Sequence, residues 1–93
     1  LKTYSGGVLN GRAIDLVKPK YPAEARKAKV SGAVNVQMLI DEDGNVVSAT
    51  AVSGHPLLRK AAEEAARNST FDITMISGVP VRITGVLVFY FAP

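Results

Sequence analysis

AVNVQMLIDEDGNVVSATAV, residues 33–52, holds the clearest structural signal of this 93-residue chain and predicts a β-hairpin. Apolar side chains occupy every second position of its first half, which is the period of a strand buried on one face. This apolar face consists of Val34, Val36, Met38 and Ile40. Asp43-Gly44 then suits a tight turn, because glycine adopts the positive φ that such turns require. We therefore expect a return strand over residues 46–52.

Two helices are expected on either side of this hairpin. Pro22 opens the first, over residues 23–28, because proline at the start of a helix sacrifices no hydrogen bond. The second is predicted over residues 56–68, and charged residues such as Arg59 and Glu63 are spaced to pair along its outer side. The side chains of its apolar stripe are small enough for the helix to lie close on a sheet; the stripe consists of Leu58, Ala61, Ala62, Ala65 and Ala66.

A long final strand is predicted over residues 81–91, with one apolar face and one face that is only half polar. The apolar face carries Val81, Ile83, Leu87, Phe89 and Phe91. The order of elements indicates an α+β fold, in which two helices pack on one face of a small antiparallel sheet of about three main strands. The Gly-rich residues 1–11 are expected to form a flexible approach segment, and residues 12–93 the folded domain.

The composition is that of a globular domain, with 47% hydrophobic and 20% charged residues. Cysteine is absent, which excludes disulfides and thiol chemistry. The net charge is +3, and basic residues are concentrated between positions 12 and 29. Such a patch suits an acidic or phosphate-bearing partner, or serves solubility alone. No apolar run approaches the 18 residues expected of a bilayer span.

Catalytic and metal-binding motifs find little support in the sequence. His55, the only histidine, precedes the second helix, and we interpret it as a helix-entry residue. Asp41, Asp43 and Asn45 have the alternate spacing of a calcium loop, but valines stand where that loop needs its glycine and its final acid. We therefore predict a non-enzymatic domain with no catalytic residue, no metal and no cofactor.

The final strand is the most informative candidate for binding. Phe89 and Phe91 are expected in the core, which leaves only one aromatic ring outward and argues against nucleic-acid binding. A long β-branched strand at a sheet edge offers unpaired backbone groups to a partner strand. We predict that an extended peptide adds to this edge and meets the outward side chains Arg82, Thr84, Val86, Val88 and Tyr90. The alternative is an edge protected by the N-terminal arm or by dimerisation.

An ordered series of short motifs resembles the TonB C-terminal family over residues 12–92. The series consists of Tyr21-Pro22 with Ala25, Ser31-Gly32-Ala33-Val34, Ile40-Asp41, Asp43-Gly44-Asn45-Val46, Ser53-Gly54, Leu57-Leu58, Ala61-Ala62, Ala65, Phe71, Gly78, Pro80-Val81 and Phe89-Tyr90-Phe91. Two positions depart from the pattern. Ser69 stands where the family often has tryptophan, and Ile73 stands where it often has proline.

The resemblance implies a periplasmic domain of a Gram-negative bacterium, anchored in the inner membrane by an N-terminal helix that works with ExbB and ExbD. It also implies that the last strand pairs with the TonB box of an outer-membrane transporter for iron chelates or cobalamin, and passes on force. The family position just ahead of the Tyr-Pro motif is implicated in the same contact, so the candidate site includes Lys18, Pro19, Lys20 and Tyr21. The alternative is a structural or homodimerisation module that has no transporter partner.

Overall fold

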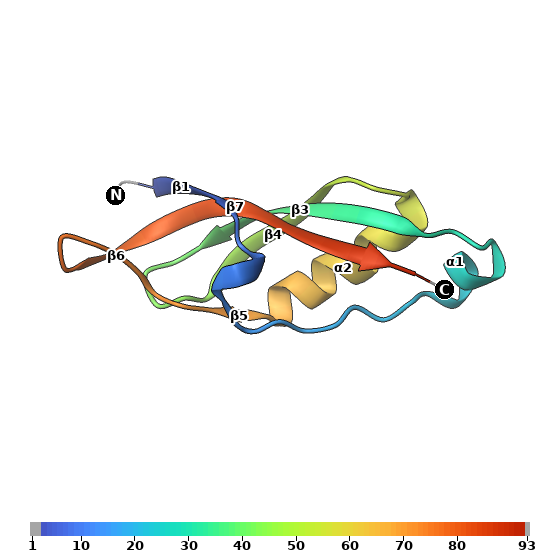
Figure 1. The fold of residues 1–93 in the computed structure, drawn as a ribbon, viewed down its shortest axis with the longest axis horizontal. Helices are drawn as coiled ribbons and strands as arrows, with labels where there is room; N and C mark the ends of the chain where they lie inside the picture. The colour runs from blue at the N-terminus through green and yellow to red at the C-terminus, as the bar shows by residue number, and fades with distance from the viewer. Residues whose placement is uncertain (1–2, 93) are drawn as a thin grey trace.

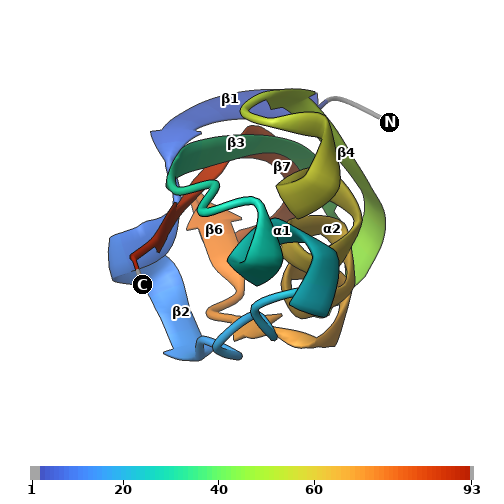
Figure 2. The ribbon, with the colours of Figure 1, turned by 90° about the vertical axis from the view of Figure 1, so that its right-hand side faces the viewer.

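The computed structural model describes residues 3–92, and the molecule is elongated, with extents of 49 × 21 × 17 Å. A twisted sheet follows the long axis, and both helices lie against one of its faces (Figure 1; Figure 2). In chain order the elements are β1 (Thr3–Val8), a 3-10 turn η1 (Asn10–Arg12), β2 (Ala13–Asp15), α1 (Ala23–Lys27), β3 (Gly32–Ile40), β4 (Val46–Ser53), α2 (Pro56–Asn68), β5 (Thr70–Phe71), β6 (Thr74–Ile76) and β7 (Val79–Phe91).

The sheet is larger than the sequence indicated, and it is mixed rather than antiparallel. Its strands run in the order β1-β7-β3-β4, with β6 forming a hairpin with the start of β7. β3 pairs antiparallel with both β4 and β7, whereas β1 pairs parallel to β7. The α+β class with two helices is therefore confirmed, and the strand count and the antiparallel pairing are corrected. The two additional strands are β1 and β6. β1 comes from residues 3–8, which contain two glycines and carry no strand signal of their own.

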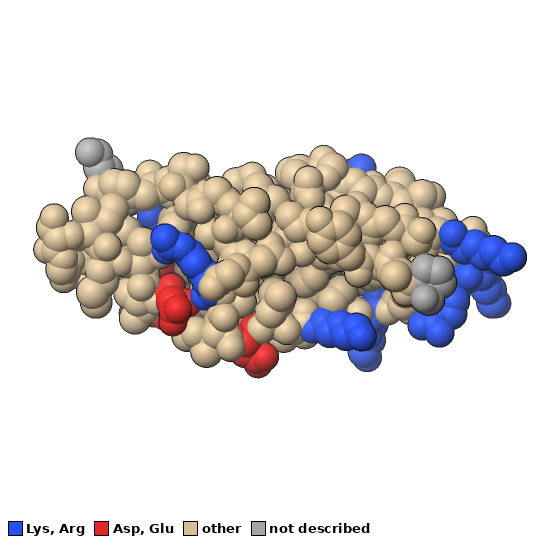
Figure 3. All heavy atoms as spheres, in the orientation of Figure 1, with Lys and Arg blue, Asp and Glu red and all other residues tan. Residues whose placement is uncertain are grey.

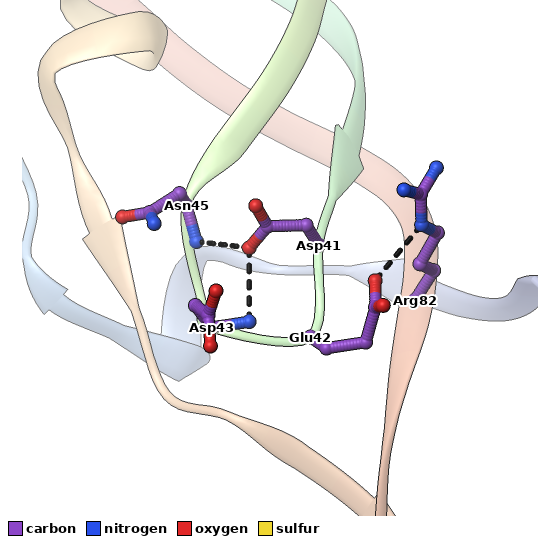
Figure 4. Close-up of polar contacts among 5 residues, drawn as sticks. All are labelled: Asp41, Glu42, Asp43, Asn45 and Arg82. Atoms are coloured by element: carbon purple, nitrogen blue, oxygen red, sulfur yellow. Dashed lines mark hydrogen bonds and ion pairs between the residues drawn. The ribbon is translucent and has the colours of Figure 1, made fainter.

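The predicted hairpin is confirmed as β3 and β4, joined by a turn that the carboxylate of Asp41 stabilises (Figure 4). Asp41 Oδ1 accepts hydrogen bonds from the backbone N–H groups of Asp43 and Asn45, both at 2.9 Å. Gly44 has a φ of +84°, and a Cβ at this position would lie 2.3 Å from the carbonyl oxygen of Phe71. The spacing that resembles a calcium loop therefore serves to close the turn.

The hydrophobic core lies between the sheet and α2. α2 has the predicted bounds, and His55 caps its start by accepting the N–H of Leu57 on Nδ1 at 3.2 Å, which confirms His55 as a helix-entry residue. The inward faces of β3 and β7 alternate as predicted. The buried hydrophobic residues are Leu9, Ala25, Val34, Val36, Met38, Ile40, Ala49, Leu58, Ala62, Ala65, Ala66, Phe71, Ile83, Leu87, Phe89 and Phe91.

Charged side chains of α2 contact the edge strand β4 instead of one another. Glu63 Oε2 accepts the backbone N–H of Ala51 at 2.7 Å, and Arg67 Nη2 donates to the carbonyl of Ala49 at 3.4 Å. The ion pairs predicted along the outside of this helix are not formed in the part of the chain that the structure describes. Among residues 3–92, β4 has a strand neighbour on one side only, so the backbone groups on its other side are available to bond with these side chains.

Charge is unevenly distributed along the molecule. Figure 3 shows lysine and arginine gathered at the end that carries α1. The basic residues in and around α1 are Lys18, Lys20, Arg26, Lys27 and Lys29. The acidic turn between β3 and β4 lies toward the opposite end, where Glu42 Oε1 pairs with Arg82 Nε at 2.8 Å (Figure 4). The basic concentration in the sequence is therefore also a local surface in space.

Candidate strand-addition site

The candidate site is built on β7, whose two edges have different neighbours. β3 pairs with one edge from Ile83 to Phe91. On the other edge, the carbonyl of Val86 and both backbone groups of Val88 bond to the N-terminal segment. A strand directs the backbone groups of alternate residues to alternate edges, so the even-numbered residues of β7 present their N–H and C=O groups on this second edge. We refer to it as the outer edge of β7.

The N-terminal segment lies along the outer edge of β7. β1 runs parallel to β7, with Ser5 opposite Thr84, and the N–H of Leu9 donates to the carbonyl of Val86 at 2.8 Å. The sequence predicts a flexible approach segment over residues 1–11. The structure places residues 3–8 in the sheet, while residues 1 and 2 lie outside the described part. The pairing arises because β7 offers a row of backbone donors and acceptors that a short segment can use without a strand signal of its own.

Asn10 extends this coverage with its side chain. Its Nδ2 donates to the carbonyl of Val88 at 2.8 Å, and its Oδ1 accepts the N–H of Val88 at 3.0 Å. A side-chain amide thus takes the place of the backbone amide of an added strand. Beyond Val88, no strand within residues 3–92 pairs with the outer edge, and the side chain of Tyr90 is 79% exposed.

Leu9 fastens the segment to the core. Its side chain is fully buried and lies directly over Gly85 of β7. A Cβ at Gly85 would lie 2.5 Å from Leu9 Cγ and 2.6 Å from the carbonyl oxygen of Gly7, so only glycine permits this approach. Gly6 has the complementary role, because a Cβ there would lie 2.3 Å from Ile83 Cδ1. The absence of side chains at Gly6 and Gly85 therefore leaves the space that Leu9 fills, and we refer to this space as the seat of Leu9.

A cleft of about 360 Å³ lies beside the end of the covered edge. Four of the nine predicted binding residues meet there, with Lys18 and Pro19 on one side and Val88 and Tyr90 on the other. Asn10, Leu16, Val17 and Phe89 complete the lining. The structure therefore brings the segment before the Tyr-Pro motif next to the last strand, as the candidate site requires.

Ser69 positions one wall of this cleft. It is buried at 3% exposure, and its Oγ accepts the N–H of Val17 at 3.0 Å while donating to the carbonyl of Ala65 at 2.8 Å. The chain just before Lys18 is thereby tied to the end of α2. Ser69 is one of the two positions that depart from the family pattern, and here its small side chain leaves room for this tie.

Tyr21 and Lys20 lie off the outer edge of β7. The hydroxyl of Tyr21 donates to the carbonyl of Val30, and its ring meets that of Phe91 edge-on with centroids 5.7 Å apart. Arg26 lies 5.3 Å above the same ring. Tyr21 thus supports the end of β7, although it also lines a smaller cleft of about 250 Å³ next to the first. Lys20 lies beside α2, where it lines a separate cleft.

The remaining predicted residues lie where the outer edge is occupied. Arg82 is engaged by Glu42, and Thr84 Oγ1 donates to the carbonyl of Tyr4 at a long 3.4 Å. The carbonyl oxygen of Val86 accepts a hydrogen bond from the N–H of Leu9. These positions can contact a partner strand only if the N-terminal segment moves away.

Three residues that the sequence did not single out shape this site: Leu9, Asn10 and Gly85. The available signal was an apolar pair, Val8-Leu9, inside a Gly-rich stretch that otherwise reads as a linker. Gly85 interrupts a β-branched strand, and a glycine inside a strand marks a close backbone approach. Neither signal identifies its partner, because the contacts join residues more than 75 positions apart.

The site offers backbone hydrogen bonds and shallow clefts rather than reactive groups. Within residues 3–92, no three His, Cys, Asp or Glu side chains converge as a metal site would require. Among the described helices, none is long and apolar enough to cross a membrane. The arrangement suits an extended peptide, which needs a row of donors and acceptors together with a few side-chain contacts.

Comparisons with known proteins agree with this architecture. A family model described as Gram-negative bacterial TonB protein C-terminal matches residues 17–93. A solution NMR structure of the Pseudomonas aeruginosa TonB CTD aligns with a TM-score of 0.69 and 22% sequence identity, over 94% of this chain and 93% of that chain. That likeness concerns the fold. No curated protein matches the sequence. The family match begins after β1, η1 and β2, so it does not include the segment on the outer edge of β7.

Proposed function

We propose that this chain, which belongs to the Gram-negative TonB C-terminal family, binds the TonB box of an outer-membrane transporter by strand addition to the outer edge of β7. Members of this family are periplasmic, non-catalytic interaction domains. The observation that carries the proposal is the N-terminal segment itself. Its seat on β7 indicates that the outer edge accepts an extended chain with good hydrogen-bond geometry.

The cleft at Lys18 and Pro19 supports the same site. It adjoins the part of the outer edge that has no strand partner within residues 3–92, where the backbone groups of Tyr90 face outward. A peptide that pairs with Tyr90 would lie against Pro19 and would pass close to the ammonium group of Lys18. An acidic residue in the peptide would be favoured there, because the surrounding surface is basic.

The proposed role also includes the transmission of force. β7 pairs with β3 over nine consecutive positions, from Ile83 to Phe91, so a pull on an added strand is distributed over many hydrogen bonds. The corresponding full-length protein would be anchored in the inner membrane, work with ExbB and ExbD, and serve a transporter of the iron-chelate or cobalamin class.

The test is an amide NMR titration of the domain with peptides that carry TonB-box sequences. We expect shifts on Val88–Phe91 and on Lys18–Tyr21. Tyr90→Pro should weaken binding about fivefold, since it removes one N–H from the outer edge and one hydrogen bond contributes about 1 kcal/mol. Tyr90→Val is the matched control, because it changes the side chain and keeps the N–H. Equal affinity of the two variants would exclude strand pairing at this position.

One observation favours a second role, that of a structural module without a transporter partner. The outer edge is already occupied by residues 3–10, as a strand protected against partners would be. Absence of shifts with every peptide, together with slow exchange of the Val88 amide, would support this role. Sedimentation at several concentrations would then show whether two copies share the edge.

A further inference from the structure

The N-terminal arm, residues 3–10, is held to the rest of the molecule in an unusual way. β1 packs chiefly against β7, and none of its residues is buried; Val8, for example, is 65% exposed. Ser5, Gly6 and Gly7 have little preference for strand conformation, and glycine loses more chain entropy on ordering than any other residue. The arm is therefore attached by backbone hydrogen bonds, by the Asn10 side chain and by a single buried leucine.

The chain becomes firmly attached again directly after the arm. The carbonyl of Arg12 accepts the N–H of Asp72 at 3.1 Å, and its guanidinium donates to Thr74 Oγ1 at 2.7 Å. β2 then pairs with β5. The arm can therefore leave β7 while the remainder of the domain keeps its contacts. This is the arrangement expected of a segment whose local stability is lower than that of the fold.

Departure of the arm would leave a specific vacancy. Leu9 is fully buried over Gly85, so its removal opens an apolar space that water fills poorly. A segment that replaces the arm regains most by inserting a side chain of similar size at the same place. It must also be small at the position of Gly6, because Ile83 allows no Cβ there in its present rotamer.

We infer that the N-terminal arm is an internal competitor for the outer edge of β7, and that a partner segment displaces it by running parallel to β7 with a leucine-sized side chain in the seat of Leu9. This inference rests on the proposed function, in which a peptide adds to that edge. The observed affinity of a peptide then equals its intrinsic affinity multiplied by the fraction of molecules whose arm is open. Segments that bind the open edge weakly, or that lack a side chain fitting the space of Leu9, therefore do not displace the arm.

A reversible lock on the arm tests the inference. The chain has no cysteine, so S5C/T84C introduces a unique pair at two residues that lie opposite each other in the sheet. The probe is a synthetic peptide that copies residues 3–12, TYSGGVLNGR, together with a version in which its leucine is alanine. A tethered arm competes at millimolar effective concentration, so the titration extends to several millimolar peptide.

We expect the oxidised protein to bind the peptide at least tenfold more weakly than the reduced protein, and the alanine peptide to bind at least tenfold more weakly than the leucine peptide. A second variant needs no disulfide. Gly6→Val, which places side-chain atoms against Ile83, should loosen the arm and strengthen binding about fivefold or more. Gly11→Val is its control, because a Cβ at Gly11 meets no atom within 4 Å.

The same proteins separate this inference from the proposed function. Equal binding of the copied peptide to oxidised and reduced protein, or no binding to the reduced protein and to Gly6→Val, overturns the competitor role. TonB-box peptides that bind both redox states equally would overturn it as well, while leaving the proposed function intact. TonB-box peptides that bind neither state, alongside a copied peptide that binds only the reduced state, would remove the transporter as partner and support the competing arm.

Discussion

The three strands β7, β3 and β4 form a sheet whose two edges are covered in different ways. On the β4 edge, side chains rooted in α2 bond to the strand backbone, with Glu63 on Ala51 and Arg67 on Ala49. On the outer edge of β7, a separate stretch of backbone lies in place and a single side chain, Leu9, enters the core. An exposed edge invites uncontrolled pairing, so both need cover. The difference shows which cover can be removed: α2 cannot leave without the core, whereas the arm can.

The largest expected effect concerns the anchoring of α2. Leu58 is fully buried, and Leu58→Ala should lower the free energy of unfolding by about 2–5 kcal/mol in urea denaturation. Leu57→Ala, one residue earlier and 37% exposed, should cost less than about 1 kcal/mol. Similar losses for the two variants would mean that α2 is not rooted in the core, and the comparison of the two edges would fail.

The second effect concerns the seat of the arm. Gly85→Ala places a Cβ 2.5 Å from Leu9 Cγ, and we expect it to displace the arm from β7. The free energy of unfolding should fall by about 1–3 kcal/mol. Hydrogen exchange should accelerate at the amide of Leu9 and remain slow at that of Gln37, in the middle of β3. Gly11→Ala should change neither amide. Parallel acceleration at both would show that the arm and the fold open as one unit.

A smaller effect sharpens the picture of the β4 edge. Glu63→Ala leaves the N–H of Ala51 without its carboxylate acceptor, which should lower the free energy of unfolding by about 1–2 kcal/mol. Glu63→Gln keeps an acceptor and should recover much of this loss. Glu64→Ala, which removes a neighbouring carboxylate that accepts no backbone N–H of β4 in the described structure, serves as the control. Thermal denaturation of the three variants would rank them, and equal melting temperatures for Glu63→Ala and Glu64→Ala would contradict a protective role of Glu63.

The smallest effect concerns Asn10. Asn10→Ala removes both hydrogen bonds to Val88. It should lower the free energy that holds the arm on β7 by about 1 kcal/mol, without weakening the rest of the fold. The amide of Val88 should then exchange faster, while that of Ala51 on the opposite edge keeps its rate. Asn68→Ala is the matched substitution, because the Asn68 amide donates to the carbonyl of Glu64 within α2 and not to β7 in the described part of the chain. An unchanged rate at Val88 would show that Asn10 does not protect the outer edge.

Elements with a clear local pattern were predictable from the sequence. The turn around Gly44 and the bounds of α2 follow from short-range chemistry, and the alternation of β7 identified both its buried and its outward residues. The meeting of Lys18 and Pro19 with Tyr90 was also anticipated, through the family resemblance rather than through spacing.

The contacts that close the two edges were not predictable. β1 forms because β7 supplies its bonding partners, and a Gly-rich stretch does not reveal a partner about 80 residues away. The side chains of Glu63 and Arg67 were assigned to ion pairs because i,i+4 spacing describes an isolated helix. In the folded chain a neighbouring strand edge binds both side chains, and only the assembled structure brings that edge within reach.

The separation of charge described above has a consequence for encounter with a partner. Cations around α1 at one end of a 49 Å body and acids in the turn toward the other give the domain an electric dipole along its long axis. In the electric field of an anionic surface, the domain orients before contact so that its α1 end and the cleft at Lys18 face that surface. Association should therefore slow as ionic strength rises and the screening length falls to about 10 Å at 0.1 M salt. Dissociation, governed by short-range backbone bonds, should be far less sensitive to salt.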